Sequence, residues 1–245
     1  TGWAAMTAMQ LADIGKRCVS LTGAQAGILT DGVHGAARIL SIDTARIMRE
    51  LDAGKIVVAA GFQGAERGGD TTTLGRGGSD TTAVELAAAL KADRCEIYSD
   101  VDGIYTADPR LVTGAVRLDS IDYGDMLHLA LHGSQVLHSR SVEAAMRANV
   151  RVHLLSSFTR HEGTVMCKLD DRSGLCGVTR DPSLGTVSII GREADAHVLA
   201  EAVAALAHSD IIVTRTELFD GGCSLFVSPD RLLPALEITH RRFFR

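Results

Sequence analysis

Short runs of β-branched and apolar residues alternate with Ala- and Leu-rich helical patterns over the first two-thirds of this chain. The predicted strands cover residues 17–21, 55–60, 94–99 and 150–156, and the predicted helices cover residues 3–15, 81–92, 123–133 and 141–148. Strands that alternate with helices need crossover connections, which produce a mainly parallel sheet sandwiched by helices. The predicted fold class is therefore α/β, with ligands expected at the carboxyl ends of the strands.

The pattern changes near Lys168, after which the sequence predicts a smaller α+β unit. Its elements are a strand at 184–191, a helix at 194–208, strands at 210–217 and 223–228, and a helix from Pro229. This β-α-β-β-α order is ferredoxin-like. Pro229 suits the first turn of the last helix and Ser228 suits its N-cap. We expect a domain boundary within residues 168–176, which gives domains 1–168 and 169–245.

Composition excludes several classes of function. The chain has 245 residues and a formal net charge of −5, so no large positive field would recruit a nucleic acid. No apolar run approaches the roughly 20 residues of a membrane span, and no signal peptide opens the chain. The five cysteines form no C-x-x-C pair, so we expect neither zinc nor a disulfide framework, and a reducing, cytoplasmic location. His128 and His132 lack a third ligand, so no metal site is predicted there.

A glycine-rich stretch at residues 61–82 is the first candidate binding loop. Glycines allow the backbone to approach a ligand closely, and the free N–H groups at the start of the following helix attract anions. The stretch carries six polar groups: Thr71, Thr72, Thr73, Arg76, Ser79 and Asp80. Arg76 is suited to clamp a carboxylate through two parallel hydrogen bonds. Ser79 and Asp80 have a purely structural alternative, as caps of the helix that is predicted from Thr81.

Residues 99–110, SDVDGIYTADPR, are the second candidate binding loop. They follow a predicted strand, and the turn formers Asp102-Gly103 and Asp108-Pro109 hold an aromatic residue and an arginine at fixed spacing. Tyr105 could pack against a nucleobase and Arg110 could reach phosphate oxygens. Ser99 and Asp100 lie at the carboxyl end of the strand, where a nucleotide would bind. Taken alone, the loop also fits an ordinary surface turn.

These loops carry a resemblance to the aspartokinases of the amino-acid kinase superfamily. The matching segments are SLTGAQAGILTD (20–31), GFQG (61–64), TTTLGRGGSDTTA (71–83), SDVDGIYTADPR (99–110), LHGSQVLHSRSVEAA (131–145) and SSFTRHEGT (156–164). The segment DGIYTADPR is shared fairly widely in the superfamily, whereas LGRGGSD together with SSF…EGT is specific to aspartokinases. The C-terminal unit resembles a single ACT regulatory domain.

The resemblance implies transfer of the γ-phosphoryl group of ATP to the side-chain carboxylate of L-aspartate or a related amino acid. Thr73, Arg76 and Ser79 would then bind the amino acid, with Arg76 and Asp80 catalytic. The implied nucleotide-binding residues are Ser99, Asp100, Tyr105, Arg110 and Gln135. Mg²⁺ would bridge phosphate oxygens, without a protein metal site of its own. The resemblance also implies a homo-oligomer formed through the ACT-like domains.

Three departures from the family pattern leave a second hypothesis open. The N-terminal K-F-G-G strand is absent from this chain, which starts at Thr1, so we expect the N-terminal part of the domain to lie outside it. The T-G-E motif reads Thr1-Gly2-Trp3, and Gln135 replaces a phosphate-binding lysine. Removal of one preorganised charge typically costs about 10²–10³ in rate. A catalytically impaired homologue with a ligand-binding or accessory role is therefore the alternative to an active kinase. Another amino-acid kinase, for glutamate or acetylglutamate, fits the fold but not the SSF…EGT segment.

Overall fold

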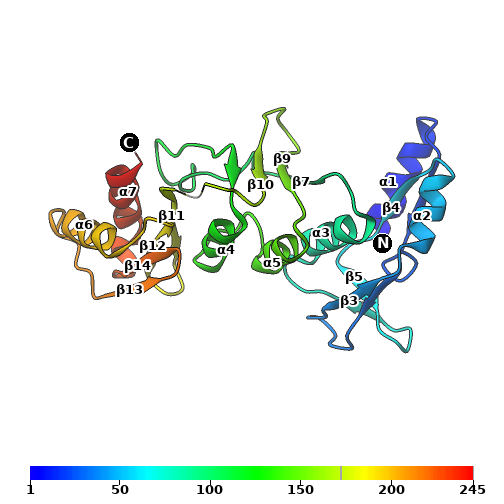
Figure 1. Cartoon of the computed structure of the whole chain (residues 1–245), viewed down its shortest axis with the longest axis horizontal. Helices are drawn as coiled ribbons and strands as arrows, with labels where there is room; N and C mark the ends of the chain where they lie inside the picture. Colours follow the sequence, from blue (N-terminus) through cyan, green and yellow to red (C-terminus); the bar gives the residue numbers. More distant parts are fainter. Residues whose placement is uncertain (172, 245) are drawn as a thin grey trace. The chain divides into compact units, whose positions relative to one another are not determined.

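The computed structural model describes residues 1–171 and 173–244 (Figure 1). The chain divides into two compact units, residues 1–95 and residues 96–245. Both units combine helices with sheets that contain parallel strand pairs, so the predicted α/β class is confirmed. The sheets of residues 1–168 also contain antiparallel pairs, which the simple strand–helix alternation does not predict.

The first unit contains two sheets and three helices among the described residues. Its elements are α1 (Gly2–Asp13), β1 (Cys18–Leu21), β2 (Ile28–Thr30), β3 (Ile39–Ile42), α2 (Ala45–Asp52), β4 (Ile56–Ala59), β5 (Gln63–Ala65), β6 (Thr71–Thr73) and α3 (Gly78–Leu90). Strands β1 and β4 pair in parallel, and the second sheet has the order β3-β2-β5-β6. In the second sheet β2 and β5 pair in parallel, whereas the β2–β3 and β5–β6 pairs are antiparallel. The predicted strands at 17–21 and 55–60 are confirmed.

The core of the first unit explains why these segments fold as they do. Leu21, Ile28 and Ile47 are buried together, with partly buried Val57 and Leu86 packed against them. They come from β1, β2, α2, β4 and α3, so every layer contributes apolar surface to one cluster. Burial of such side chains contributes about 1.5–3 kcal/mol each, which offsets the entropy lost by these short strands.

The second unit begins with the third of the four strands predicted in the first two-thirds of the chain. Its first elements are β7 (Cys95–Ser99, which starts at the division between the units), β8 (Ser120–Ile121), α4 (Tyr123–Leu131), α5 (Ser139–Ala148), β9 (Val152–Ser156) and β10 (Thr164–Met166). Their sheet has the order β7-β9-β10-β8. Asp122 begins α4, because its side chain accepts a hydrogen bond from the Gly124 N–H at 2.8 Å. The predicted helices at 123–133 and 141–148 are confirmed.

The C-terminal part of the second unit is the predicted α+β arrangement with one more strand. Its elements are β11 (Leu175–Asp181), β12 (Thr186–Gly191), α6 (Ala196–Ala207), β13 (Arg215–Phe219), β14 (Gly222–Phe226), a 3₁₀ turn (Pro229–Arg231) and α7 (Leu232–Phe243). The sheet order is β11-β12-β14-β13, with antiparallel neighbours throughout.

Three details of this C-terminal part differ from the sequence prediction. The sequence predicts no strand at residues 175–181, but β11 forms there and pairs with β12, with a register shift between Leu175 and Gly177. The strand predicted from residue 210 begins at Arg215, because Asp210 has a φ of +54° and the Ile211 N–H closes the end of α6 on the Leu206 carbonyl. Ser228 is the N-cap residue of the 3₁₀ turn, as expected, but its side chain makes no capping hydrogen bond.

The domain boundary within residues 168–176 stays a prediction. Arg172, inside that range, lies outside the described residues. The division into compact units falls instead at residues 95 and 96. Within the second unit, Ala107 and Val112 are buried in the same hydrophobic cluster as Val178 and Leu236, so segments from both sides of residue 168 share a core.

Candidate functional site

The glycine-rich stretch 61–82 folds as a tight hairpin followed by a turn into α3. Strands β5 and β6 pair antiparallel, with Gln63 opposite Thr73. The hairpin was not predicted, since its strands have only three residues each and carry few apolar side chains. The buried Thr72 hydroxyl lies 2.5 Å from the Thr30 hydroxyl of β2 and so fixes β6 to the sheet. We call residues 71–80 the amino-acid loop below.

Glycines determine the conformation of the amino-acid loop at its turn. Gly75 and Gly77 have φ values of +76° and +68°, which side-chain-bearing residues rarely adopt. Gly78 lacks room for a side chain, because a Cβ would lie 2.8 Å from the Phe62 ring and 2.9 Å from the Leu74 Cβ. Arg76 stands between these glycines with an exposed side chain. The turn therefore presents one guanidinium group on a backbone conformation that glycine adopts at little cost.

The predicted amino-acid-binding residues lie on this loop and on the first turn of α3. Thr73 ends β6 and is half-buried, and its carbonyl accepts a hydrogen bond from the Ala37 N–H. Helix α3 begins at Gly78, three residues earlier than predicted, with Gly77 as its N-cap. Ser79 and Asp80 therefore lie inside the first turn and do not cap the helix. The Gly78 N–H already donates to the Gly75 carbonyl at 3.0 Å. The N–H groups that follow it in a first turn have no preceding helical carbonyl to bind, so they attract anions.

Phe62, which lies against the amino-acid loop, has a strained backbone that the sequence did not indicate. Its φ of +68° lies in the left-handed region, where a non-glycine residue costs about 1–3 kcal/mol. The conformation is held at both ends: the Phe62 N–H donates to the Thr82 hydroxyl at 3.1 Å, and its carbonyl accepts from the Leu74 N–H at 3.0 Å. Such strain is common beside binding sites, where the surrounding structure enforces one geometry.

Residues 99–110, here called the nucleotide loop, leave the end of β7 in the second unit. The Ser99 hydroxyl donates to the Asp100 carboxylate at 3.0 Å, and the Ser99 carbonyl accepts from the Ser157 N–H at 2.8 Å. Gly103 has a φ of +143°, and a Cβ there would lie 2.6 Å from the Thr164 hydroxyl. Residues 156–164, the segment SSFTRHEGT, therefore lie against the nucleotide loop.

Tyr105 belongs to a hydrogen-bonded group whose other members sequence reasoning missed. Its hydroxyl donates to one Asp102 oxygen at 2.9 Å, and the His161 Nδ1 lies 2.8 Å from the other oxygen. The hydrogen bond from His161 holds the pKa of Asp102 below its usual value, while burial and the bond to Asp102 raise the pKa of Tyr105. No sequence signal joins His161 to Asp102, because 59 residues separate them.

Arg110 is folded back on its own loop. Its Nε and one terminal nitrogen donate to the two Asp108 oxygens at 3.0 and 2.8 Å, a bidentate pair. The Arg110 hydrogen bond also holds the pKa of Asp108 below its usual value. Because the Arg110 side chain is 76% exposed, this pair contributes at most about 1 kcal/mol and a phosphate could compete for the guanidinium group.

Gln135 lies in the connection between α4 and α5, with an exposed side chain. Just after it, the His138 ring begins α5 by accepting a hydrogen bond from the Arg140 N–H at 3.3 Å. This use of His138 as a helix cap was not predicted. The roles of Gln135 and of the other site residues in binding stay predictions.

Acid titration offers a direct test of the group around Asp102. A carboxylate with a depressed pKa in the folded protein adds stability above its unfolded pKa of about 3.9, and this stability is lost as pH falls through the folded value. We expect Asp102→Asn to lower the free energy of unfolding by under about 1 kcal/mol at pH 7, because the His161 partner is largely exposed. The difference from wild type should shrink below about pH 4.

Urea unfolding at several pH values measures this difference. Asp119→Asn is the matched control, because Asp119 is an exposed aspartate in the same unit. It should change stability little at every pH. An Asp102→Asn effect of equal size at pH 3 and pH 7 would contradict the assignment of the stabilisation to the ionised carboxylate.

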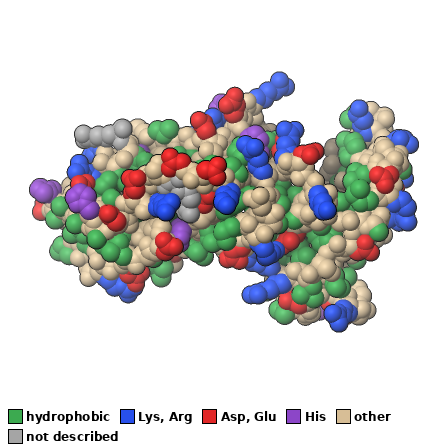
Figure 2. Space-filling view, in the orientation of Figure 1, with side chains coloured by type: hydrophobic (Ala, Val, Ile, Leu, Met, Phe, Trp, Pro, Cys, Tyr) green, Lys and Arg blue, Asp and Glu red, His purple; other side chains and the backbone are tan. Residues whose placement is uncertain are grey.

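Other features of the described residues add no further site of this kind. No cluster of three His, Cys, Asp or Glu side chains suited to a metal occurs among residues 1–171 and 173–244. Over the same residues, no helix has the length and apolarity needed to cross a membrane. Acidic and basic side chains are interspersed on the face shown in Figure 2. Each of the five cysteines is a free thiol.

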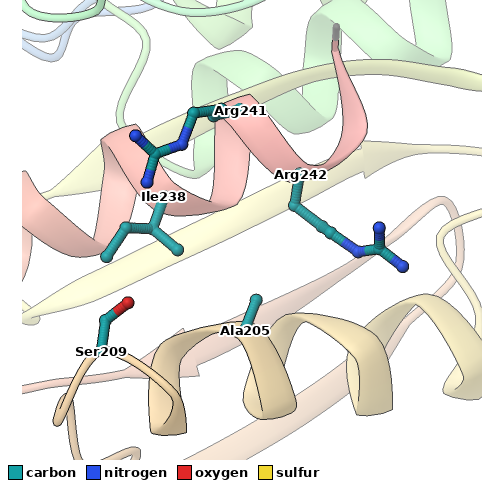
Figure 3. A pocket seen from close by; sticks show the side chains of 5 residues that line it. All are labelled: Ala205, Ser209, Ile238, Arg241 and Arg242. Carbon is teal, nitrogen blue, oxygen red and sulfur yellow. The ribbon is translucent and has the colours of Figure 1, made fainter.

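A hollow of about 250 Å³ opens between α6 and α7 in the C-terminal part (Figure 3). Its lining consists of Ala205, Ser209, Ile238, Arg241 and Arg242. One of the two arginines is already paired, since Arg242 donates to Glu201 at 2.9 Å. None of the predicted site residues lines this hollow.

Comparison with known proteins decides the family. The profile of the Amino acid kinase family matches residues 2–156, which is more than half of the chain. The chain belongs to this family. The matched range includes both the amino-acid loop and the nucleotide loop, so both are parts of an amino acid kinase fold.

Curated relatives within this amino acid kinase family are aspartokinases. The chain is 46% identical over 212 residues to the aspartokinase of Geobacillus stearothermophilus, covering 85% of this chain and 52% of the relative. It is 55% identical over 162 residues to the aspartate kinase of Pseudomonas fluorescens, covering 66% of this chain and 39% of that enzyme. The chain thus spans about half the length of the curated relatives it matches.

A solved aspartokinase structure is similar to this chain in fold. Aspartokinase III of E. coli, crystallised in complex with aspartate and ADP, matches with a TM-score of 0.65 and 28% identity over 96% of this chain and 57% of that chain. The resemblance noted from the loop sequences is therefore confirmed.

Proposed function

We propose that this protein is an aspartate kinase, which transfers the γ-phosphoryl group of ATP to the side-chain carboxylate of L-aspartate. Support comes from its membership of the amino acid kinase family and from relatives that carry this name. The observation that carries the proposal is the turn Gly75-Arg76-Gly77-Gly78, which holds an exposed guanidinium group beside the first turn of α3. The guanidinium group and the N–H groups at the start of the helix could each bind one carboxylate of aspartate.

The chemistry asks the protein mainly for positioning. A carboxylate oxygen of aspartate attacks the γ-phosphorus, the bond from that phosphorus to the β,γ-bridging oxygen breaks, and ADP leaves with that electron pair. In this proposal Arg76 binds a substrate carboxylate, Thr73 and Ser79 offer hydroxyl groups, and Asp80 orients the substrate ammonium group.

The nucleotide loop is proposed to bind ATP. Tyr105 would pack on the base, while Arg110 exchanges Asp108 for phosphate oxygens, and Ser99, Asp100 and Gln135 complete the set. Mg²⁺ keeps most of its ligands as water and phosphate oxygens when it travels with a nucleotide.

The ACT-like assignment, self-association and location are parts of the same proposal. The four-stranded sheet β11-β12-β14-β13 with α6 and α7 supports an ACT-like unit. Strand β13 lies at the edge of that sheet with four of its five residues exposed, so we propose that copies of the chain pair there. Five free thiols support a cytoplasmic location.

A hydroxamate assay with L-aspartate, ATP and Mg²⁺ tests the activity on the full chain. Acyl phosphates react with hydroxylamine, so turnover should appear as aspartyl hydroxamate and should require all three components. Calorimetric titration with MgATP and with aspartate runs in parallel. Binding of both ligands without turnover would refute the kinase proposal and favour an impaired homologue, which no comparison supports at present. L-glutamate in place of aspartate is the specificity control.

A further inference from the structure

The nucleotide loop is built into the hydrophobic core of the C-terminal α+β part. Ala107 of this loop is 4% exposed, and Val112, two residues beyond the end of the loop, is 3% exposed. Both belong to the cluster that contains Val178 of β11, Leu225 of β14 and Leu236 of α7. A loop that only crossed the surface would not bury these side chains. The loop conformation therefore depends on the elements that follow it in the sequence.

The backbone of Thr106 connects the nucleotide loop to β11. Its carbonyl accepts a hydrogen bond from the Val178 N–H at 2.7 Å, and its N–H donates to the Val116 carbonyl at 2.9 Å. Gly177 allows β11 to approach Thr106 this closely, since a Cβ at that position would lie 3.0 Å from the Thr106 carbonyl oxygen. Both backbone groups of Thr106 are thus held, one by its own segment and one by β11.

The Thr106 side chain adds a second connection, to α7. Its hydroxyl oxygen accepts a hydrogen bond from the Val116 N–H at 3.0 Å and lies 2.9 Å from the His240 Nε2. A hydroxyl group has a single hydrogen, which it can donate to a ring nitrogen that carries none. His240 is 2% exposed, and burial lowers the pKa of its ring, which favours the neutral form with a free lone pair. The Phe244 ring stacks on His240 at 5.2 Å.

We infer that His240 is a positioning residue for the nucleotide loop. Through its hydrogen bond with the Thr106 hydroxyl, it holds the loop in the conformation that binds a nucleoside triphosphate. Thr106 directly follows Tyr105 and precedes Arg110 by four residues, so a shift at Thr106 moves the base-packing ring and the phosphate-binding guanidinium group together. The ligand part of this inference rests on the proposed function. His240 itself is buried and contacts the loop, not the ligand.

Helix α7 offers a matched control on its other face. Arg241 is adjacent to His240 in sequence, but it is exposed and lines the hollow between α6 and α7 (Figure 3). Leu206 offers a second control, because it is fully buried in the same hydrophobic cluster as the loop but lies on α6. Leu206→Ala lowers stability without removing the hydrogen bond between Thr106 and His240.

Hydrogen exchange on the full chain tests the positioning without any ligand. His240→Leu should speed exchange of the Thr106, Val116 and Val178 amides by about tenfold, because the hydrogen bond between the Thr106 hydroxyl and the His240 ring is lost and the loop loosens. His240→Gln supplies an amide group that can hydrogen-bond to that hydroxyl as acceptor or donor, and it should restore most of the protection. Arg241→Ala should match wild type. Unchanged exchange at these three amides in His240→Leu would overturn the inference.

Steady-state kinetics then tests the ligand part. His240→Leu should raise the KM for ATP about tenfold and change kcat and the KM for aspartate by less than about threefold. Leu206→Ala should leave the KM for ATP unchanged, which separates positioning from lost stability. Equal KM values for ATP in wild type and His240→Leu would overturn the ligand part. Absence of turnover in wild type would refute the proposed function instead, while the exchange result still decides the positioning.

Discussion

Arg76→Ala is expected to lower kcat/KM for L-aspartate by about 10²–10³-fold, while the free energy of unfolding changes by less than about 0.5 kcal/mol. The side chain is exposed on a turn whose backbone is fixed by Gly75 and Gly77. Its removal therefore costs no packing, but the substrate loses a paired, charged donor. Arg76→Lys keeps the charge without the planar fork and should recover only part of the activity.

Arg67→Ala is the matched control for Arg76→Ala. Arg67 is also exposed and lies on the turn between β5 and β6, outside the amino-acid loop. Its loss should change kcat/KM by less than about twofold. The same assay as above, with thermal and urea unfolding of each variant, measures both quantities. Wild-type affinity for aspartate in Arg76→Ala would reject the placement of this residue in the amino-acid site.

Gly163→Ala is expected to lower the free energy of unfolding by about 3 kcal/mol or more. Gly163 has a φ of +71°, and a Cβ there would lie 2.0 Å from the Leu154 carbonyl oxygen of β9. The backbone of residues 156–164 must shift to relieve this contact. That segment supports the nucleotide loop through the Thr164 hydroxyl, which accepts from the Ile104 N–H at 2.9 Å. The KM for ATP should therefore rise as well.

Gly114→Ala separates conformational strain from the steric contact. Gly114 also has a positive φ, of +93°, but a Cβ there would have no atom within 4 Å beyond its chain neighbours. Its substitution should cost only about 1 kcal/mol, through strain alone. Urea unfolding of both variants measures the two free energies. Equal losses of stability in Gly163→Ala and Gly114→Ala would contradict the prediction, because they would show that the contact with the Leu154 carbonyl is relieved without loss of free energy.

Local sequence patterns predicted most of the helices and several strands, but they missed helix α2 and the seven-residue strand β11. Helix α1 ends before Gly15, whose φ of +78° stops it, and α4 begins at its Asp122 cap. Such signals act over a few residues, so they can be recognised in a sequence. The short strands β5 and β6 were missed, because three residues carry too little periodicity to distinguish a hairpin from a loop.

The candidate site could be predicted as two loops, though not as a set of contacts. Both loops were recognised from their glycines, turn formers and charged groups, and by resemblance to a known family. Their local conformations were predicted less well. Helix α3 starts three residues early, so that Ser79 and Asp80 lie within it, and Arg110 pairs with Asp108. Hydrogen bonds between near neighbours depend on exact turn geometry, which composition does not define.

The sequence by itself determined the α/β class, the two glycine- and turn-rich loops, the absence of a strongly basic charge balance, and the family to which the loops point. Only the tertiary structure decided which distant groups meet. His161 reaches Asp102 across 59 residues, and His240 reaches Thr106 across 134 residues. The physical reason is that burial and hydrogen-bond satisfaction are properties of the packed chain. The sequence around a histidine does not indicate which distant residue it will contact, whereas the conformational freedom of a glycine is a property of that residue alone.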